Sequence, residues 1–184
     1  MNTKVCRILS IDPGCSHMGT AILDLFLDGS IMVQYAETIH TDKLIKYLKD
    51  VNYTHGGRYA KLIAINTQLK NVLTLYQPNV IVSENAFINP KRPVAFGALV
   101  EAISMVRTTV YQHNPSIPLE TIDPSSIKKA VGVSGISGDK GLMQAAMLKC
   151  NLLYEPYLNP HLFDEHTVDA CCIGYAFCER LKLL

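Results

Sequence analysis

Four side chains that could bind a divalent metal occur in three separate parts of the sequence. Asp12 ends one apolar run, Glu84 ends another, and His166 and Asp169 lie three positions apart near the C-terminus. Carboxylates gathered at one point repel each other, and a divalent cation relieves that repulsion. Two such cations about 4 Å apart would hold the attacking and leaving oxygens of a phosphodiester. If these residues converge, they predict a site for metal-dependent phosphodiester hydrolysis.

Each of these features also has a purely structural interpretation. Asp12-Pro13-Gly14 is typical of a turn, because Asp, Pro and Gly are the usual turn residues. Glu84 could be a surface residue at the end of a strand. His166 and Asp169 could compensate the dipole at the start of a helix, although Asp164 and Glu165 fit that role better than Asp169 does. The residues alone therefore leave both interpretations open.

The elements that must position these residues follow from the spacing of apolar residues. Strands are predicted over Val5–Asp12, Gly19–Phe26, Ser30–Thr38, Val80–Val82 and Leu119–Ile122. Helices are predicted over Arg58–Tyr76, Val94–Gln112, Asp139–Cys150 and Glu165–Leu183, and Asp123 is the expected N-cap of a further short helix. The segment from residue 41 to 57 is polar and ambiguous, with a short helix as one interpretation.

This order of elements predicts an α/β fold with a five-stranded mixed sheet flanked by helices. Short links, including the hairpin signal Asp28-Gly29, predict that the first three strands are antiparallel. Helical crossovers predict two further parallel strands. The strands that end at Asp12 and Glu84 are then expected to be neighbours whose ends share one rim. The length of 184 residues suits a single domain, 1–184.

Composition narrows the class of protein. The net charge is only +1, but residues 124–151 carry four lysines against one Asp, and residues 155–170 carry four acids with no Lys or Arg. A basic segment beside an acidic one would suit the binding of a polyanion next to a metal ion. The alternative is that the two segments reflect only the ordinary variation of charge over a protein surface. No apolar run approaches a membrane span, and we expect no signal peptide. Six cysteines without metal-type spacing are typical of a reduced cytosolic protein.

Three acidic motifs in order resemble those of the RuvC-type Holliday-junction resolvases. They are Ile11-Asp12-Pro13-Gly14, Glu84-Asn85-Ala86-Phe87 and His166-Thr167-Val168-Asp169-Ala170. The resemblance covers nearly the whole chain and implies an RNase H-like fold. It implies metal ligation by the three carboxylates, with His166 as the fourth ligand at a position where the family commonly has Asp. Asp164 is an alternative fourth ligand.

The resemblance also implies a set of DNA-binding residues: Phe87, Lys91, Arg92, Lys128, Lys129 and Lys140. Phe87 matches a family aromatic that stacks on bases at the junction centre, and core packing is the alternative. Either Lys128 or Lys129, together with Lys140, matches positions that contact phosphate. Lys140 would also have a catalytic role, because its charge would offset negative charge developing on the phosphate. Lys91 and Arg92 could contact the backbone or belong to a solvated turn.

The implied activity is that of an Mg²⁺-dependent endodeoxyribonuclease that resolves four-way junctions by paired symmetric nicks. The resemblance implies two Mg²⁺ ions per active site, for which Mn²⁺ would substitute. Two nicks require two sites, which a homodimer supplies. Small residues along Val94–Gln112 would allow that helix to pack closely on a partner, or instead on the sheet. We expect the protein in the cytoplasm of a bacterium or of a phage- or virus-infected host cell, with branched DNA and no membrane as its partner.

Three other functions compete with this one. An ATP-handling protein of the actin/Hsp70-like type shares the Asp-x-Gly turn but needs two such units, and the chain has room for one. Another RNase H-like nuclease, acting on flaps or RNA–DNA hybrids, would have the same metal site. A non-catalytic junction-binding module would be expected to lack an acid, whereas Asp12, Glu84 and Asp169 are all present.

Overall fold

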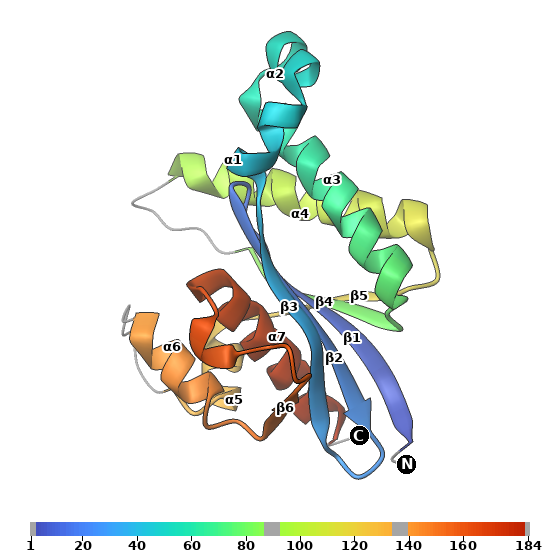
Figure 1. Ribbon diagram of the computed structural model, residues 1–184, viewed down its shortest axis with the longest axis vertical. Helices are drawn as coiled ribbons and strands as arrows, with labels where there is room; N and C mark the ends of the chain where they lie inside the picture. The colour runs from blue at the N-terminus through green and yellow to red at the C-terminus, as the bar shows by residue number, and fades with distance from the viewer. Residues whose placement is uncertain (1–2, 87–92, 134–139, 183–184) are drawn as a thin grey trace.

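A single mixed sheet forms the middle layer of the protein, as Figure 1 shows for the computed structural model, which describes residues 3–86, 93–133 and 140–182. Its strands are β1 (Lys4–Asp12), β2 (His17–Phe26), β3 (Ile31–His40), β4 (Val80–Glu84), β5 (Leu119–Ile122) and β6 (Leu152–Tyr154). Their spatial order is β5-β4-β1-β2-β3-β6. The α/β class and the five predicted strands are confirmed.

The pairing of the central strands also agrees with the prediction. β1, β2 and β3 form an antiparallel meander, and Gly29 takes the positive φ of 81° that the tight β2–β3 link needs. β4 lies parallel to β1, with Ile11 opposite Ser83, and β5 lies parallel to β4. The two strands that carry Asp12 and Glu84 are therefore direct neighbours.

The predicted strand count of five is wrong by one. The sixth strand, β6, is three residues long and pairs in parallel with β3 at the edge opposite β5. Its sequence Leu152-Leu153-Tyr154 is too short to show alternation, and only Asn151 separates it from the predicted helical pattern that ends at Cys150. Tertiary pairing with β3, rather than local sequence, defines this strand.

Helices cover both faces of the sheet (Figure 1). One face carries α3 (Gly57–Tyr76) and α4 (Pro93–His113), and the other carries α5 (Pro124–Ala130), α6 (Lys140–Met147) and α7 (Glu165–Leu181). The short elements are α1 (Thr41–Leu44), η1 (Ile45–Tyr47), α2 (Lys49–His55) and η2 (Pro160–Leu162). Asp123 is the N-cap of α5 as predicted, but its side chain accepts from Asn85 Nδ2 at 3.2 Å instead of capping the helix.

Two hydrophobic cores lie on opposite faces of the sheet, because successive side chains of a strand point to opposite sides. In β1, Ile8 belongs to the core under α7, whereas Leu9 and Ile11 belong to the core under α3 and α4. Gly174 permits close packing of α7, since a Cβ there would lie 2.4 Å from Leu23 Cδ1 and 2.9 Å from Ser10 Oγ. At Gly174, α7 therefore lies very close to strands β1 and β2.

Candidate active site

The alternation of the strands turns two of the predicted acids toward α7. Val80 and Val82 pack in the core under α7, so Glu84, two positions later, lies on the same side of β4. Asp12 follows Ile8 in the same way on β1. Since β1 and β4 are parallel and adjacent, both carboxylates lie at one rim of the sheet. The expectation that these two strand ends meet is confirmed.

Gly19 allows the beginning of α7 to reach this rim. It lies opposite Asp12 in the β1–β2 pairing, and a Cβ at this position would be 1.9 Å from the carbonyl oxygen of His166 and 3.2 Å from Asp12 Cβ. Any residue larger than glycine would push the first turn of α7 away. The glycine therefore fixes the distance between the strand that carries Asp12 and the helix that carries His166 and Asp169.

Asp12 and His166 are in direct contact. His166 Nδ1 lies 2.8 Å from Asp12 Oδ2, and the Asp12 side chain is only 12% exposed. Burial raises the pKa of Asp12, and the His166 contact partly offsets this rise. The same hydrogen bond raises the pKa of His166, because the carboxylate favours the charged imidazolium. The two residues thus form a coupled pair at the centre of the site.

Glu84 and Asp169, both half-buried, lie near the buried Asp12. Burial, followed by the charges of Asp12 and Asp169, raises the pKa of Glu84 from 4.5 to about 7. Burial and the charge of Asp12 raise the pKa of Asp169 from 3.8 to about 7. Within the described residues neither carboxylate forms a hydrogen bond or an ion pair, and Lys128 is the lysine whose charge opposes both shifts. Glu84 and Asp169 therefore lose their protons less readily than free carboxyl groups do, and a cation beside them would favour the ionised forms.

Asp164 has a structural role at the start of α7. Its Oδ1 accepts from the backbone N–H of Thr167 at 2.9 Å and from Thr38 Oγ1 at 2.5 Å. These bonds lower the pKa of Asp164 and hold its carboxylate as the N-cap of the helix. This engagement favours His166 over Asp164 as the fourth member of the cluster.

Other residues that position the site have no local signal in the sequence. Thr41 Oγ1 donates to the carbonyl of Cys15 at 2.8 Å, and Lys61 Nζ lies 2.8 Å from Ser16 Oγ, so the turn after Asp12 is held from α1 and α3. The ring of His17 stacks on that of His166, with centroids 5.4 Å apart and an interplanar angle of 2°. These contacts link distant parts of the chain and could be found only once the fold was known.

The structure separates the two adjacent lysines that the sequence leaves as alternatives. Lys128 is half-buried on α5 and faces the charges of Glu84 and Asp169, whereas Lys129 is exposed. Lys140 is the first residue of α6. The predictions for Phe87, Lys91 and Arg92 concern residues outside the described ranges.

The donor set of the cluster fits a divalent cation. Carboxylate oxygens suit Mg²⁺ and Mn²⁺, and an imidazole adds a nitrogen donor that Mn²⁺ and later transition metals accept. Burial and then the charges of neighbouring acids raise the pKa values of Glu84 and Asp169, and a bound cation would offset both effects. In residues 3–86, 93–133 and 140–182, no three His, Cys, Asp or Glu side chains already stand close enough to ligate one ion.

Comparison with known proteins identifies the family. The crossover junction endodeoxyribonuclease RuvC of Wolbachia pipientis subsp. Culex pipiens is 31% identical to this chain over 156 residues, which cover 79% of the chain and 84% of that protein. The chain belongs to the RuvC family. The RuvC of Prochlorococcus marinus is 24% identical over 152 residues, covering 82% of this chain. No family model matches the sequence.

Solved structures confirm the RNase H-like arrangement expected of a RuvC-family chain. Thermus thermophilus RuvC in complex with a Holliday junction substrate superposes with a TM-score of 0.72 and 14% identity, covering 96% of both chains. The yeast mitochondrial Holliday junction resolvase Ydc2 gives a TM-score of 0.65 and 14% identity, covering 98% of this chain and 86% of that one. The resemblance to RuvC resolvases predicted from the three acidic motifs is confirmed.

Proposed function

We propose that this protein is an endodeoxyribonuclease that resolves four-way DNA junctions by paired symmetric nicks. The observation that supports the proposal is that β1, β4 and α7 carry the buried Asp12 and the half-buried Glu84 and Asp169, whose charges act on one another, at one rim of a RuvC-type fold. Relatives over most of the chain are named crossover junction endodeoxyribonuclease. One structural neighbour was solved with its Holliday junction substrate.

The three carboxylates and His166 would hold divalent metal, on which nucleases of the RuvC family depend. We propose two Mg²⁺ ions per site, with Mn²⁺ able to replace them. When bound, the ions supply positive charge to the attacking and leaving oxygens of the phosphodiester. His166 would orient the Asp12 carboxylate through Nδ1, and it must be neutral to ligate metal. Because Asp12 raises the pKa of His166, acidification will protonate the imidazole and lower activity.

Basic residues on the α5–α6 side would bind the scissile strand. Lys128 already acts electrostatically on Glu84 and Asp169, so a phosphate beside the cluster would lie within reach of its charge. We assign Lys140 the neighbouring contact that offsets charge developing in the transition state. Phe87, Lys91, Arg92 and Lys129 would contact the junction around the site.

We also propose that the protein acts as a homodimer through α4. By length and composition, Val94–His113 would be able to cross a membrane, with a mean hydropathy of 1.3, yet only 28% of the window is buried. Val94 is 80% exposed and Val100 is 40% exposed. A second copy packing on this apolar face would bury it and would supply the second active site. The expectation that no apolar run approaches a membrane span is wrong by length and composition for Val94–His113. We assign the apolar character of this helix to packing against a second copy.

We also propose a cellular compartment for the protein and a single domain for its chain. All six cysteines are free, and three of them, Cys171, Cys172 and Cys178, are buried in α7. Free thiols are typical of a reducing compartment, so we expect the protein to act in the cytoplasm. We propose that residues 1–184 form a single nuclease domain, since both hydrophobic cores pack on one sheet.

A panel of substrates tests the function. The protein is incubated with Mg²⁺ and a synthetic four-way junction, beside a duplex, a flap and an RNA–DNA hybrid of matched sequence. Nicks at symmetric positions in opposite strands of the junction, with 5′-phosphate and 3′-hydroxyl ends, are expected. Preferential cleavage of the hybrid or flap would assign the site to another RNase H-like nuclease. Binding of the junction without cleavage in any divalent metal would assign a binding module.

A further inference from the structure

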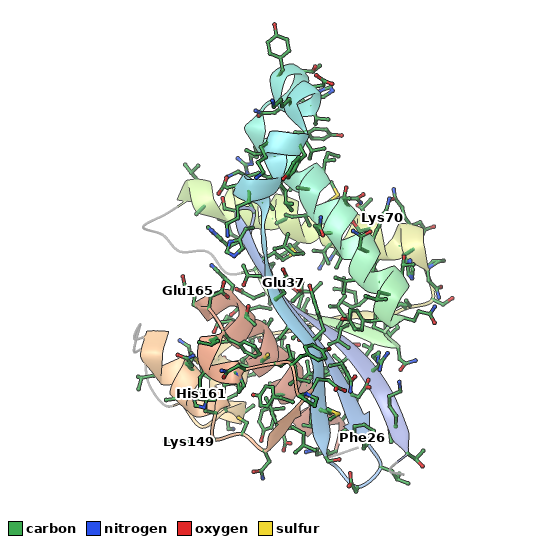
Figure 2. The ribbon with its side chains drawn as sticks, viewed as in Figure 1. Phe26, Glu37, Lys70, Lys149, His161 and Glu165 are labelled. Atoms are coloured by element: carbon green, nitrogen blue, oxygen red, sulfur yellow. The ribbon has the colours of Figure 1, made fainter. Side chains whose placement is uncertain are left out.

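The segment Thr41–His55 forms a helical projection that the nuclease site does not use. It consists of α1, η1 and α2, and Figure 1 shows α2 standing clear of the sheet at one end of the molecule. Side chains extend from α2 into solvent around its tip (Figure 2). Except for Thr41, none of the residues in these three elements is buried. A segment that contributes so little to the core needs another explanation.

The exposed surface of the projection is basic and aromatic. Lys43, Lys46 and Lys49 are all exposed, and within the described residues none of them forms an ion pair. Tyr47 is 75% exposed and Tyr53 is 94% exposed, so both rings and their hydroxyls are accessible to a partner. The ammonium of Lys46 lies 4.9 Å from the centre of the Tyr47 ring.

The acidic residues of the projection do not cancel this charge. Asp42 is held by Lys61 of α3, with Oδ1 and Nζ 2.7 Å apart, so its charge is paired outside the projection. Asp50 is then the remaining acid against three lysines. The excess positive charge, with tyrosine hydroxyls that can donate to phosphate oxygens, is complementary to a nucleic-acid backbone.

The base of the projection is tied to the proposed nuclease site. Thr41 donates its backbone N–H to the carbonyl of Ser16 at 3.0 Å and its hydroxyl to the carbonyl of Cys15 at 2.8 Å. Those residues belong to the turn that directly follows Asp12. Lys61, which pairs with Asp42, also contacts Ser16 Oγ. The projection therefore begins next to the turn that follows Asp12.

We propose that the helical projection binds the phosphate backbone of a duplex arm of the same DNA that is cut at the Asp12 cluster. The inference rests on the proposed function, because it takes branched DNA as the substrate. Lys43, Lys46 and Lys49 would neutralise phosphates, and Tyr47 and Tyr53 would pack against the sugar–phosphate chain. The contact adds affinity without reading sequence, since it reaches phosphates and not base edges.

The test is the salt dependence of junction binding, measured by fluorescence anisotropy in EDTA so that no strand is cut. The variant K46Q/K49Q removes two charges from the projection. Its matched control, K4Q/K70Q, removes two charges from exposed lysines far from α5, α6 and the projection, of which Figure 2 labels Lys70. Because each neutralised phosphate adds about 0.9 to the slope of log K against log salt, the projection variant should lower that slope by about 2.

The expected result is a slope reduced by about 2 and, if the affinities converge near 1 M salt, binding up to about sixtyfold weaker near 0.1 M salt. The control should retain the wild-type slope, and Y53S should weaken binding severalfold without changing the slope. Equal slopes for K46Q/K49Q, its control and the wild type would overturn the inference. So would a changed dimer dissociation constant in sedimentation with the slope unchanged, since the projection would then be a protein interface. Failure of the wild type to bind the junction would instead refute the proposed function.

Discussion

The carboxylates of Asp12, Glu84 and Asp169 make the stability of the metal-free protein depend on pH in a specific direction. A carboxyl whose pKa is raised on folding binds more protons in the native state than in the unfolded state, so stability falls as pH rises. For Glu84 the fall begins near its ordinary pKa of 4.5 and is complete above about 7. The raised pKa of His166 acts in the same direction, because its stabilising charge is lost at higher pH.

The size of the effect follows from the shift. Ionising Glu84 at pH 8 with a pKa of about 7 instead of 4.5 costs about 3 kcal/mol of unfolding free energy. The full gain is not expected from Glu84→Gln. Glu84 is in partial contact with solvent, and the amide of the new glutamine also needs hydrogen-bond partners, so we expect a gain of about 2 kcal/mol. In EDTA at pH 8 the variant should therefore melt about 4 to 8 °C above the wild type, since 1 kcal/mol corresponds to about 2 to 4 °C at this size.

The assay is urea and thermal unfolding of both proteins in EDTA between pH 5 and pH 8. The advantage of Glu84→Gln should be absent at pH 5 and should grow through neutral pH. Glu155→Gln, which lies beyond β6 and outside the cluster, should follow the wild type at every pH. Adding Mg²⁺ at pH 8 should stabilise the wild type and leave Glu84→Gln unchanged. A variant no more stable than the wild type at pH 8 would refute the proposal that Glu84 is an unneutralised buried charge.

Four other substitutions test separate parts of the structure. Gly19→Ala should cost about 3 kcal/mol of stability in urea unfolding, because its Cβ would overlap the His166 carbonyl, and full stability would refute that close approach. Thr38→Val should cost about 1 to 2 kcal/mol in urea unfolding, because Asp164 loses the hydrogen bond from the Thr38 hydroxyl. Unchanged stability would show that this bond does not support the N-cap of α7. His166→Asp should raise the affinity for Mg²⁺ relative to Mn²⁺ in calorimetric titrations, and an unchanged ratio would exclude the imidazole from the ligand set. Val100→Arg should convert dimers to monomers in sedimentation velocity, whereas a persistent dimer would place the interface elsewhere.

Most of the strands and helices that position the candidate site were predictable from the sequence. Apolar periodicity identified the strands that end at Asp12 and Glu84, and helical crossovers predicted that these strands are parallel neighbours, as they are. The spacing of His166 and Asp169 placed both on the first turns of α7. These predictions succeeded because each depends on a local pattern and a general rule of connection.

The features that the sequence did not reveal depend on contacts between distant residues. Gly19 resembles any glycine in a strand until the carbonyl of His166 is seen above it. The bond from Thr38 to Asp164 joins positions 126 residues apart, and β6 exists only through its pairing with β3. The polar composition of residues 41–57 did not separate a loop from the helical projection, because its short helices pack on α3 without an apolar stripe of their own.

The most direct test of the account is strand cleavage of a four-way junction by variants of the acidic cluster. Asp12→Asn, Glu84→Gln and Asp169→Asn are compared with the wild type in Mg²⁺, while junction binding is measured separately in EDTA. We predict wild-type binding for all three and a loss of cleavage of at least about a thousandfold for each, as expected for residues that act as one unit. Cleavage at near wild-type rates by any one of them would contradict the assignment of this rim as the nuclease site.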